Sequence, residues 1–539
     1  MPAPRPFPSI HLDYKDTGTD ANPGIQLFGR RFFTDQSIME YLAEFLLVAN
    51  STKRIGKGGG DFDSVLPDWE HLLRWPHGAK LGYRAPVRLC LKLFSFLGAS
   101  KLDTRHKSHK QQYEVILRDL EAAIHADGAI EKREILRSLE NLFLGFQGVG
   151  GNRTWCAQVF VPVATALLAC ETNWQQTKAG RNGVSSWGDA LPYFSSSQRL
   201  FMARGGELLY LQLCNAFRTD IDKLQQFLPL FGLSKEETDP QYLHASLERN
   251  LSRITNQCPE TLEKVAKLID GIDGFTAKQV NRETEHIWCA WCPEETWPEG
   301  YLFAVELNRL CQAAIDPVER IELLMFGCAL HVLRSLSAQS VRYAGLSEDL
   351  RASGGGLGYA WIVSSPEGSE RSVKHLSQRN LQVIQRTIQQ ALRNNDIFKN
   401  AGLHPRRSRE TLYNEADNRY GHKLFLSLGK KIGLVVPPRG PGARFVFNEK
   451  ILRYFVLTLL RPGERQTFDN FKTALYAHYG IAIHGSELSK AAFWSELPQL
   501  DAAGTESGAW LAAMLQASGF LIHLSDACSL IHNPFFYEK

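Results

Sequence analysis

Three residues of this chain have the types and the spacing of zinc ligands: His286, Cys289 and Cys292. A Cys-x-x-Cys spacing lets two thiolates bind one tetrahedral zinc ion. The sequence has no second Cys-x-x-Cys pair, and Trp288 and Trp291 in the same segment favour packing in an aromatic core. Both interpretations stay open, and we expect no bound cofactor.

The local motifs of several common enzyme classes are absent from the sequence. It contains no G-x-x-x-x-G-K-[ST] phosphate loop, no H-E-x-x-H zinc-protease helix and no G-x-S-x-G nucleophile turn. We therefore find no support for ATP binding or for these hydrolase chemistries. A metal-dependent nuclease with an active site assembled from distant residues remains an alternative, because such a site leaves no local motif.

The strongest signal is a charge asymmetry. Residues 371–453 contain 17 Lys or Arg against 5 Asp or Glu, whereas the whole chain has a net charge of only +4. A local excess of positive charge attracts polyanions such as nucleic acid.

A helix is expected over 373–395, within this basic segment. Apolar residues recur on one face, and Arg379, Arg386 and Arg393 recur every seven residues on the opposite face. Seven residues span about 10.5 Å of helix, so three guanidinium groups can follow a phosphate backbone. A solvated helix surface that binds nothing is the alternative.

A second helix and a hairpin follow, an order typical of winged-helix domains. The helix is expected over 410–431 with a break at Gly421, and the hairpin strands over 433–436 and 443–447. In such domains a helix can enter the major groove while hairpin residues contact phosphates. The expected nucleic-acid-binding residues are Arg379, Arg386, Arg393, Arg406, Arg407, Arg409, Lys423, Lys430, Lys431, Arg439 and Arg444.

The same order of elements recurs in residues 454–539, with opposite charge. This stretch contains 5 basic and 8 acidic residues, so we do not expect it to bind DNA. Its apolar residues suit a core or an interface with a protein partner. The expected elements are helices over 449–460, 467–479 and 506–518 and a hairpin of 520–524 with 528–532.

Apolar periodicity elsewhere predicts a mainly α-helical protein, with a multi-domain helical body followed by the tandem winged-helix-like units. A short strand is expected over 25–33, a helix capped by Thr34 or Asp35 over 36–48, and a loop over 51–64. The last helix of the body is expected to begin with Asp316 as N-cap and Pro317 at its first position. The helices expected in the body after the loop are 65–75, 85–98, 111–125, 130–144, 155–170, 198–217, 220–231, 240–255, 258–269, 276–289, 301–314 and 317–343.

A glycine-rich segment over 353–370 is the clearest change of composition, and we expect a domain boundary there. The expected parts are an extended arm (1–24), an N-terminal helical domain (25–150), a central helical domain (151–352), a basic winged-helix-like unit (371–453) and an acidic one (454–539).

Composition points to a soluble globular protein, with 44% hydrophobic and 22% charged residues. The longest apolar stretch is shorter than the roughly 20 residues that a membrane span needs, and the proline-rich start lacks the apolar core of a signal peptide. The ten cysteines are scattered, as is typical of buried free thiols in a reducing compartment. We expect a cytoplasmic protein that does not contact a membrane.

Near its start the chain contains the segments Phe28-Gly-Arg-Arg-Phe-Phe-Thr-Asp35 and Glu40-Tyr-Leu-Ala-Glu-Phe-Leu-Leu47. These segments and the overall architecture resemble accessory proteins of multi-gene bacterial anti-phage systems such as Druantia. The resemblance implies a non-catalytic subunit that recognises DNA, or that bridges DNA to a helicase or nuclease. It transfers no catalytic residues.

The leading hypothesis is a DNA-binding or scaffold subunit of a protein complex. Its basic segment would contact the phosphates of duplex DNA with weak sequence specificity, and its body would hold other subunits. The alternatives are the metal-dependent nuclease and a pure assembly protein that binds no nucleic acid.

Overall fold

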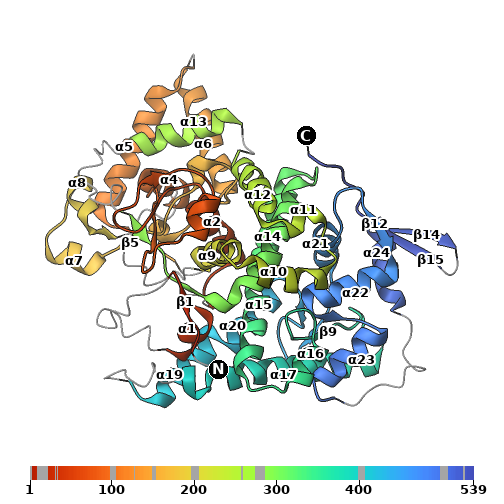
Figure 1. The fold of residues 1–539 in the computed structure, drawn as a ribbon. Helices are drawn as coiled ribbons and strands as arrows, with labels where there is room; N and C mark the ends of the chain where they lie inside the picture. Colours follow the sequence, from red (N-terminus) through yellow and green to blue (C-terminus); the bar gives the residue numbers. More distant parts are fainter. Residues whose placement is uncertain are drawn as a thin grey trace.

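The computed structural model describes residues 3–8, 22–30, 32, 34–97, 105–126, 128–148, 153–195, 205–256, 259–272, 286–368, 370–397, 407–497, 508–525 and 528–538. Within these residues the protein is mainly α-helical, as the sequence predicts, and its strands are short (Figure 1). One continuous hydrophobic core runs from Phe7 to Ile531, so the body and the C-terminal segments share buried apolar side chains.

Two long helices, α14 (Trp297–Gln312) and α15 (Pro317–Tyr343), occupy the middle of the molecule (Figure 1). The start of α15 is confirmed as predicted, because Asp316 accepts hydrogen bonds from the backbone of Val318 and Glu319 and Pro317 occupies the first position. Among the described residues, α15 is the one helix long and apolar enough to cross a membrane. Most of it is buried under other helices, which is the arrangement of a core helix in a soluble protein.

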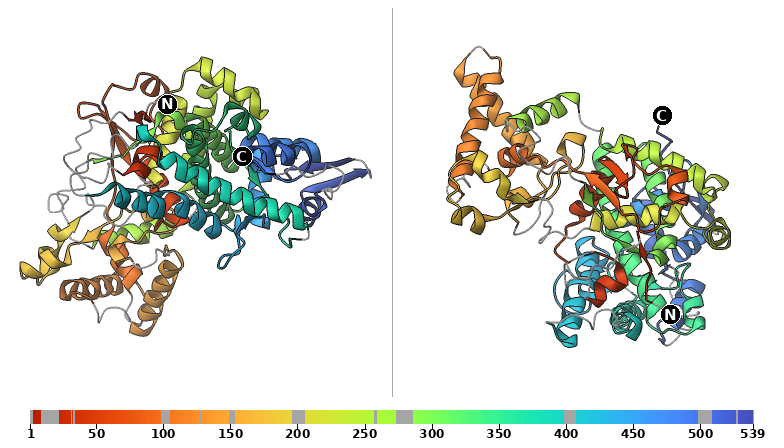
Figure 2. Two further views of the ribbon diagram at one scale, coloured as in Figure 1. Left: turned by 90° about the horizontal axis from the view of Figure 1, so that it is seen from below. Right: turned by 60° about the vertical axis from the view of Figure 1, so that its left-hand side comes forward.

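The other elements of the body surround these two helices or extend away from them (Figures 1 and 2). The helix pair α5 and α6 projects at the side opposite to the C-terminal hairpin. The α-helices are α2 (Ile38–Ala49), α3 (Trp69–Leu73), α4 (Leu89–Leu97), α5 (Lys107–Ala123), α6 (Ala129–Gly145), α7 (Gln176–Arg181), α8 (Trp187–Ala190), α9 (Gly205–Phe217), α10 (Ile221–Phe227), α11 (Lys235–Thr238), α12 (Pro240–Ile254), α13 (Glu260–Gly271) and α16 (Glu348–Ser353). The shorter elements are η2 (Trp155–Ala157), η3 (Thr165–Leu167), η4 (Leu191–Tyr193), η5 (Leu228–Phe231), η6 (Glu294–Thr296), β5 (Asn173–Trp174) and β6 (Phe194–Ser195).

The predicted loop over 51–64 is wrong, because this stretch forms a hairpin. Its strands are the centre and one edge of an antiparallel sheet in the order β3-β2-β4-β7. Lys53 is buried on one side of this sheet and donates to the carbonyl oxygens of Ala49 and Ser51 at 2.7 and 2.6 Å, closing the end of α2. A strand is recognised in a sequence by alternating polar and apolar residues. Lys53 is charged but buried at the end of a helix, so it interrupts this alternation. The four strands are β2 (Thr52–Ile55), β3 (Asp61–Phe62), β4 (Leu81–Arg84) and β7 (Ile287–Trp288).

The predicted strand over 25–33 is also wrong, because the described part contains the helix α1 (Pro23–Phe28). Asn22 caps this helix by accepting from the backbone of Gly24, and Pro23 supplies its first residue. The next helix, α2, is present as predicted, but Ser37 caps it rather than Thr34 or Asp35. Ser37 and Glu40 exchange the two hydrogen bonds of a capping box.

Two further predicted helices differ from the structure. Residues 155–170 form the two short turns η2 and η3 joined by extended chain, and the buried Lys92 ammonium donates to the carbonyl oxygens of Cys156 and Cys170. Because Lys92 satisfies these two carbonyl groups, they do not need the hydrogen bonds of a helix. The helix expected over 276–289 lies mostly outside the described residues, and its last part is β7. Within the expected N-terminal arm, β1 (Pro6–Phe7) pairs with β8 (Cys292–Pro293).

The predicted helices and hairpins of the C-terminal third are present. Helix α21 is followed by β12, two further helices, α24 and a hairpin, and the sheet has the order β12-β15-β14. The winged-helix identity of the two units stays a prediction, because it rests on this order of elements alone. The elements are β9 (Trp361–Ile362), α17 (Arg371–Leu392), α19 (Arg409–Glu415), η7 (Ala416–Tyr420), α20 (His422–Lys431), β10 (Val435–Val436), β11 (Arg444–Phe445), α21 (Glu449–Leu459), β12 (Arg465–Thr467), α22 (Phe468–Tyr479), β13 (Ile481–Ala482), α23 (Gly485–Trp494), α24 (Ala509–Ala517), β14 (Leu521–Ser525) and β15 (Cys528–His532).

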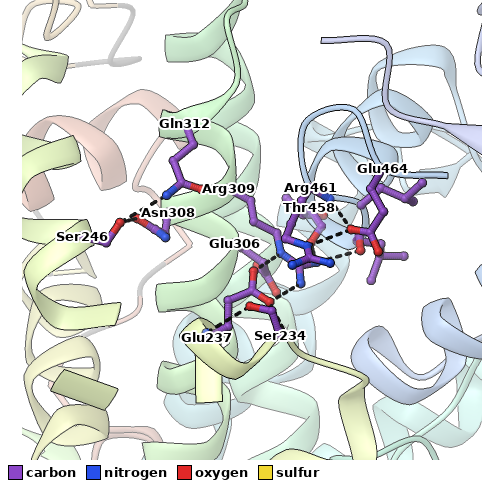
Figure 3. A network of polar contacts seen from close by, with 12 residues as sticks. Ser234, Glu237, Ser246, Glu306, Asn308, Arg309, Gln312, Thr458, Arg461 and Glu464 are labelled. Carbon is purple, nitrogen blue, oxygen red and sulfur yellow. Dashed lines mark hydrogen bonds and ion pairs between the residues drawn. The ribbon is translucent and has the colours of Figure 1, made fainter. Parts of the chain in front are cut away.

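Two buried charged side chains of α14 join the body to the C-terminal segments through hydrogen bonds (Figure 3). Arg309 donates to both carboxylate oxygens of Glu237 at 2.6 and 2.7 Å, and it also donates to the carbonyl oxygens of Thr458 and Leu459 at 2.7 Å. One guanidinium group thereby caps the end of α21 and ties it to α11. Burial would raise the pKa of Glu237, but the hydrogen bonds and the charge of Arg309 hold this pKa at about 2.

A second buried group lies one turn earlier on α14. Glu306 pairs with Arg334 on α15 and accepts from the hydroxyl of Tyr454 at 2.9 Å, while its Oε1 lies 2.6 Å from Nε2 of His478. All of these side chains are essentially inaccessible to solvent. Burial alone would raise the pKa of Glu306, but the Arg334 charge and the His478 hydrogen bond hold this pKa at about 2.

The glycine-rich segment packs closely against α22. A Cβ atom on Gly355 would lie 2.3 Å from the carbonyl oxygen of Tyr476 and 2.7 Å from the Cα atom of Gly480. Just after this contact β9 pairs in parallel with β13, so Trp361 lies opposite Ile481. The glycines at this point allow two backbones to approach each other.

We expect Gly355→Ala to lower the free energy of unfolding by about 1–3 kcal/mol, because the added methyl group must displace backbone rather than a mobile side chain. Urea unfolding followed by circular dichroism measures the change. Gly58→Ala is the matched control, since open space surrounds Gly58, and it should change stability by less than about 0.5 kcal/mol. Equal effects of the two substitutions would contradict the close packing.

Candidate nucleic-acid interface

Helix α17 presents a basic face to solvent, as predicted. Leu381, Ile384 and Ile388 are buried, whereas Arg379 and Arg386 are exposed. The helix contains no Asp or Glu along its 22 residues. Its positive charge is therefore not balanced on its own surface.

Two buried polar side chains fix the position of α17. The Asn380 amide donates to the carbonyl oxygen of Ala360 at 3.0 Å and to the Ser495 hydroxyl at 2.9 Å, while its oxygen accepts from the backbone of Ile362. The Ser377 hydroxyl accepts from the backbone of Phe445 at 3.0 Å. The helix is thus bound to β9, α23 and the β10–β11 hairpin by groups that point away from its basic face.

The β10–β11 hairpin lies beside the first half of α17. The Gln378 amide donates to the carbonyl oxygen of Gly442 at 3.3 Å, which places the hairpin turn next to the helix. Arg439, in this turn, is exposed. Arg444 has a structural role instead, because its guanidinium group donates to the Ser364 hydroxyl at 3.2 Å and to the carbonyl oxygen of Pro366 at 2.9 Å.

Helix α20 packs beside the second half of α17, and the two lie on the face of the molecule that is seen from below in Figure 2 (left). The break at Gly421 is confirmed. A Cβ atom there would lie 2.7 Å from Leu392 and 3.4 Å from Ile388, so glycine permits the close crossing. Beyond the break, Lys423 is exposed and Lys430 is partly exposed.

Several of the predicted binding residues have internal partners. Arg393 donates to both oxygens of Asp417 at 3.2 and 2.6 Å, and its guanidinium carbon lies 5.0 Å from the centre of the Tyr413 ring. Although burial would raise the pKa of Asp417, hydrogen bonds from His422 and Arg393 lower this pKa. The positive charge of Arg393 is thereby offset.

Three more predicted residues are held in similar ways. Arg407 pairs with Glu415 at 2.7 Å, and Arg409 donates to the Tyr413 hydroxyl at 3.1 Å. The Lys431 ammonium lies 3.4 and 3.3 Å from the carbonyl oxygens of Thr34 and Gln36, and partial burial lowers its pKa. The Lys431 contacts attach the basic unit to the N-terminal segment.

Five predicted residues have no ion-pair or hydrogen-bonding partner for their side chains within the described part of the chain. They lie on α17, α20 and the hairpin turn, and we call them the unpaired cations. The unpaired cations are Arg379, Arg386, Lys423, Lys430 and Arg439. Arg406 lies outside the described residues.

The sequence could not separate unpaired from paired cations, because the partners are distant in the chain. Asp417 is 24 positions from Arg393, and Thr34 is 397 positions from Lys431. The glutamines of α17 are not among the predicted binding residues, but Gln382 and Gln390 are also exposed. The regular spacing between these glutamines and the arginines is the feature of the sequence that could have identified them.

The three zinc candidates occupy different positions around β7 and β8. The His286 imidazole lies 3.2 Å from Asp61, next to the sheet, while Cys289 and Cys292 are buried. Burial raises the pKa of the Cys292 thiol well above its usual value, which opposes the thiolate form that binds zinc. The described residues contain no group of three or more His, Cys, Asp or Glu that could hold a metal ion.

The fold and this surface together define a mainly α-helical protein with an exposed basic face formed by two helices and a hairpin. No protein-family model, no curated protein and no solved structure matches the chain.

Proposed function

We propose that this protein is a nucleic-acid-binding subunit that contacts the phosphate backbone of DNA through its unpaired cations. The observation that carries the proposal is their arrangement, because Arg379 and Arg386 lie on a helix without acidic residues and Lys423 and Arg439 flank the same helix. Cations without internal partners can release condensed counterions from DNA, whereas paired ones would first have to break an ion pair.

The setting of this activity follows from the resemblance to subunits of anti-phage systems. In this proposal the protein is cytoplasmic, binds DNA without cleaving it, and holds a helicase or nuclease through its body or its acidic C-terminal unit. The exposed apolar side chains of α6 support a contact with another protein, since Ile130 and Leu144 are 74% and 57% exposed.

The test is a salt series with duplex DNA. If about five phosphates are contacted, one by each unpaired cation, the logarithm of the affinity should fall against the logarithm of salt concentration with a slope near −4.5. The variant Arg379→Glu/Arg386→Glu/Lys423→Glu removes three contacts, so we expect a slope near −2 and at least about a hundredfold weaker binding at low salt. Fluorescence anisotropy measures both quantities.

The matched control reverses three exposed arginines on α5 and α6, as Arg118→Glu/Arg133→Glu/Arg137→Glu. These helices lie on the opposite side of the molecule from α17 (Figure 1). The control changes the net charge equally and should retain most of the affinity. Equal losses in both variants would show that only the overall charge matters, and absence of binding by the wild type would contradict the proposal.

A further inference from the structure

The exposed face of α17 carries a regular stripe of arginine and glutamine. His375, Arg379, Gln382 and Arg386 follow one another at intervals of four, three and four residues, which keeps them in line along a helix. Gln389 and Arg393 continue the stripe, but His422 and Asp417 engage them. The first four residues of the stripe span about 16.5 Å, the length of roughly five base pairs.

Arginine and glutamine are the side chains that read purines in the major groove. Arginine can donate two hydrogen bonds to guanine, and glutamine can both donate to and accept from adenine. A helix surface that only needs to be soluble does not require alternating arginine and glutamine. Lysine and glutamate would keep it soluble equally well. Within the stripe from His375 to Arg386 there is no lysine and no glutamate.

The surroundings of the stripe suit a DNA duplex. The hairpin turn with Arg439 lies beside the first half of α17 and α20 with Lys423 beside the second half, so phosphate-binding cations flank the reading face. A major groove about 12 Å wide admits one helix, and the adjacent backbone then passes over neighbouring elements.

Other nucleic acids fit this surface less well. Binding of single strands relies on exposed aromatic rings that stack on bases, but α17 contains no Phe, Tyr or Trp and Phe445 of the hairpin is buried. Double-stranded RNA has a major groove too deep and narrow for side chains to read.

From this geometry we infer that α17, rather than the helix α20 that precedes the hairpin, reads base edges of duplex DNA through Arg379, Gln382 and Arg386. The inference rests on the proposed function, but it moves Arg379 and Arg386 from phosphates to base edges and leaves Lys423, Lys430 and Arg439 on the phosphates. It also replaces weak sequence specificity with a preference for a site of about five base pairs. Helix α20 is less suited to this role because it has 10 residues against the 22 of α17, and because the N-terminal segment holds its Lys431.

The experiment selects tight binders from duplexes with a randomised centre, using the full-length protein, and sequences them. We expect a purine-containing consensus bound at least about tenfold more tightly than a scrambled duplex of the same length and composition, at one salt concentration. Gln382→Ala and Arg386→Lys should reduce this ratio. Arg386→Lys keeps the charge but loses the paired donors, so the salt slope should stay unchanged. Gln176→Ala, at an exposed position on α7, is the control and should keep the ratio.

The outcomes separate the two proposals. Steep salt dependence with equal affinity for every duplex would leave the proposed function intact and overturn the inference about α17. A consensus whose strength does not change in Gln382→Ala or Arg386→Lys would also overturn it, because another surface would then read the bases. Failure of the wild type to bind any duplex would overturn both.

Discussion

Replacing Glu306 with glutamine should lower the free energy of unfolding by about 3–5 kcal/mol, because it leaves the Arg334 guanidinium charged and buried without a counter-ion. Arg334 is completely buried in the centre of the molecule. It also donates hydrogen bonds to the His331 ring nitrogen at 2.9 Å and to the backbone of Glu299 at 3.4 Å, and neither carries a negative charge. Water cannot reach the group to replace the lost carboxylate.

The loss of stability should affect the whole molecule. Glu306 lies on α14, Arg334 on α15, Tyr454 on α21 and His478 on α22, so one carboxylate joins the body to the C-terminal segments. Urea unfolding followed by tryptophan fluorescence measures the change. Trp361 is a suitable reporter because it is buried where β9 meets β13.

Two controls define the origin of this effect. Glu260→Gln makes the same chemical change in an exposed pair, where Glu260 lies 3.0 Å from Lys264, and should cost no more than about 0.5 kcal/mol. The double variant Glu306→Gln/Arg334→Met removes both charges and should recover part of the stability. A cost below about 1 kcal/mol for Glu306→Gln would show that the buried pair does not hold these helices together.

Acid should destabilise the protein between pH 6.5 and 5, because several histidines are buried in the neutral form. Burial lowers the pKa of His109 to about 3 and the pKa of His331 well below its usual value. His109 lies among aromatic rings, with the centres of Trp174 and Trp155 at 4.8 and 5.3 Å. Arg334 can only donate, so the His331 nitrogen that it contacts must be unprotonated.

The direction of the pH effect follows from the protonation of these histidines in the folded and unfolded states. In the unfolded chain these imidazoles bind protons below about pH 6.5, whereas in the folded protein they do not, so acid favours unfolding. The stabilisation is complete above pH 6.5 and is lost as the pH falls. At pH 5 the protonation of the unfolded His109 lowers the free energy of unfolding by about 2 kcal/mol, and His331 lowers it further in the same direction.

Thermal unfolding at pH 7, 6 and 5 tests this expectation. His109→Phe should flatten the pH dependence, since phenylalanine fits an aromatic cluster and does not titrate. His71→Gln, at an exposed position, should leave the dependence as it is. A melting temperature that does not fall between pH 7 and 5 would contradict the neutral burial of His109 and His331.

Local signals in the sequence predicted much of the fold. Asp316 and Pro317 located the start of α15, the glycine at 421 located the break before α20, and the proline-rich turn located the hairpin. Each depends on backbone preferences of a few neighbouring residues. At 155–170 the error arose because a distant residue, Lys92, satisfied the backbone carbonyl groups. At 51–64 it arose because the buried Lys53 contacts the end of α2 and interrupts the alternation expected of a strand.

By itself the sequence determined that the protein is mainly helical and that residues 371–453 carry an excess of positive charge, because helical periodicity and charge composition are local properties. Only the tertiary structure decided which of these charges face solvent unpaired. Asp417 neutralises Arg393 and the N-terminal segment holds Lys431, while Arg379 and Arg386 remain exposed. The glycines near 355 also acquired their role in space, since close backbone contact with α22 depends on residues more than a hundred positions away.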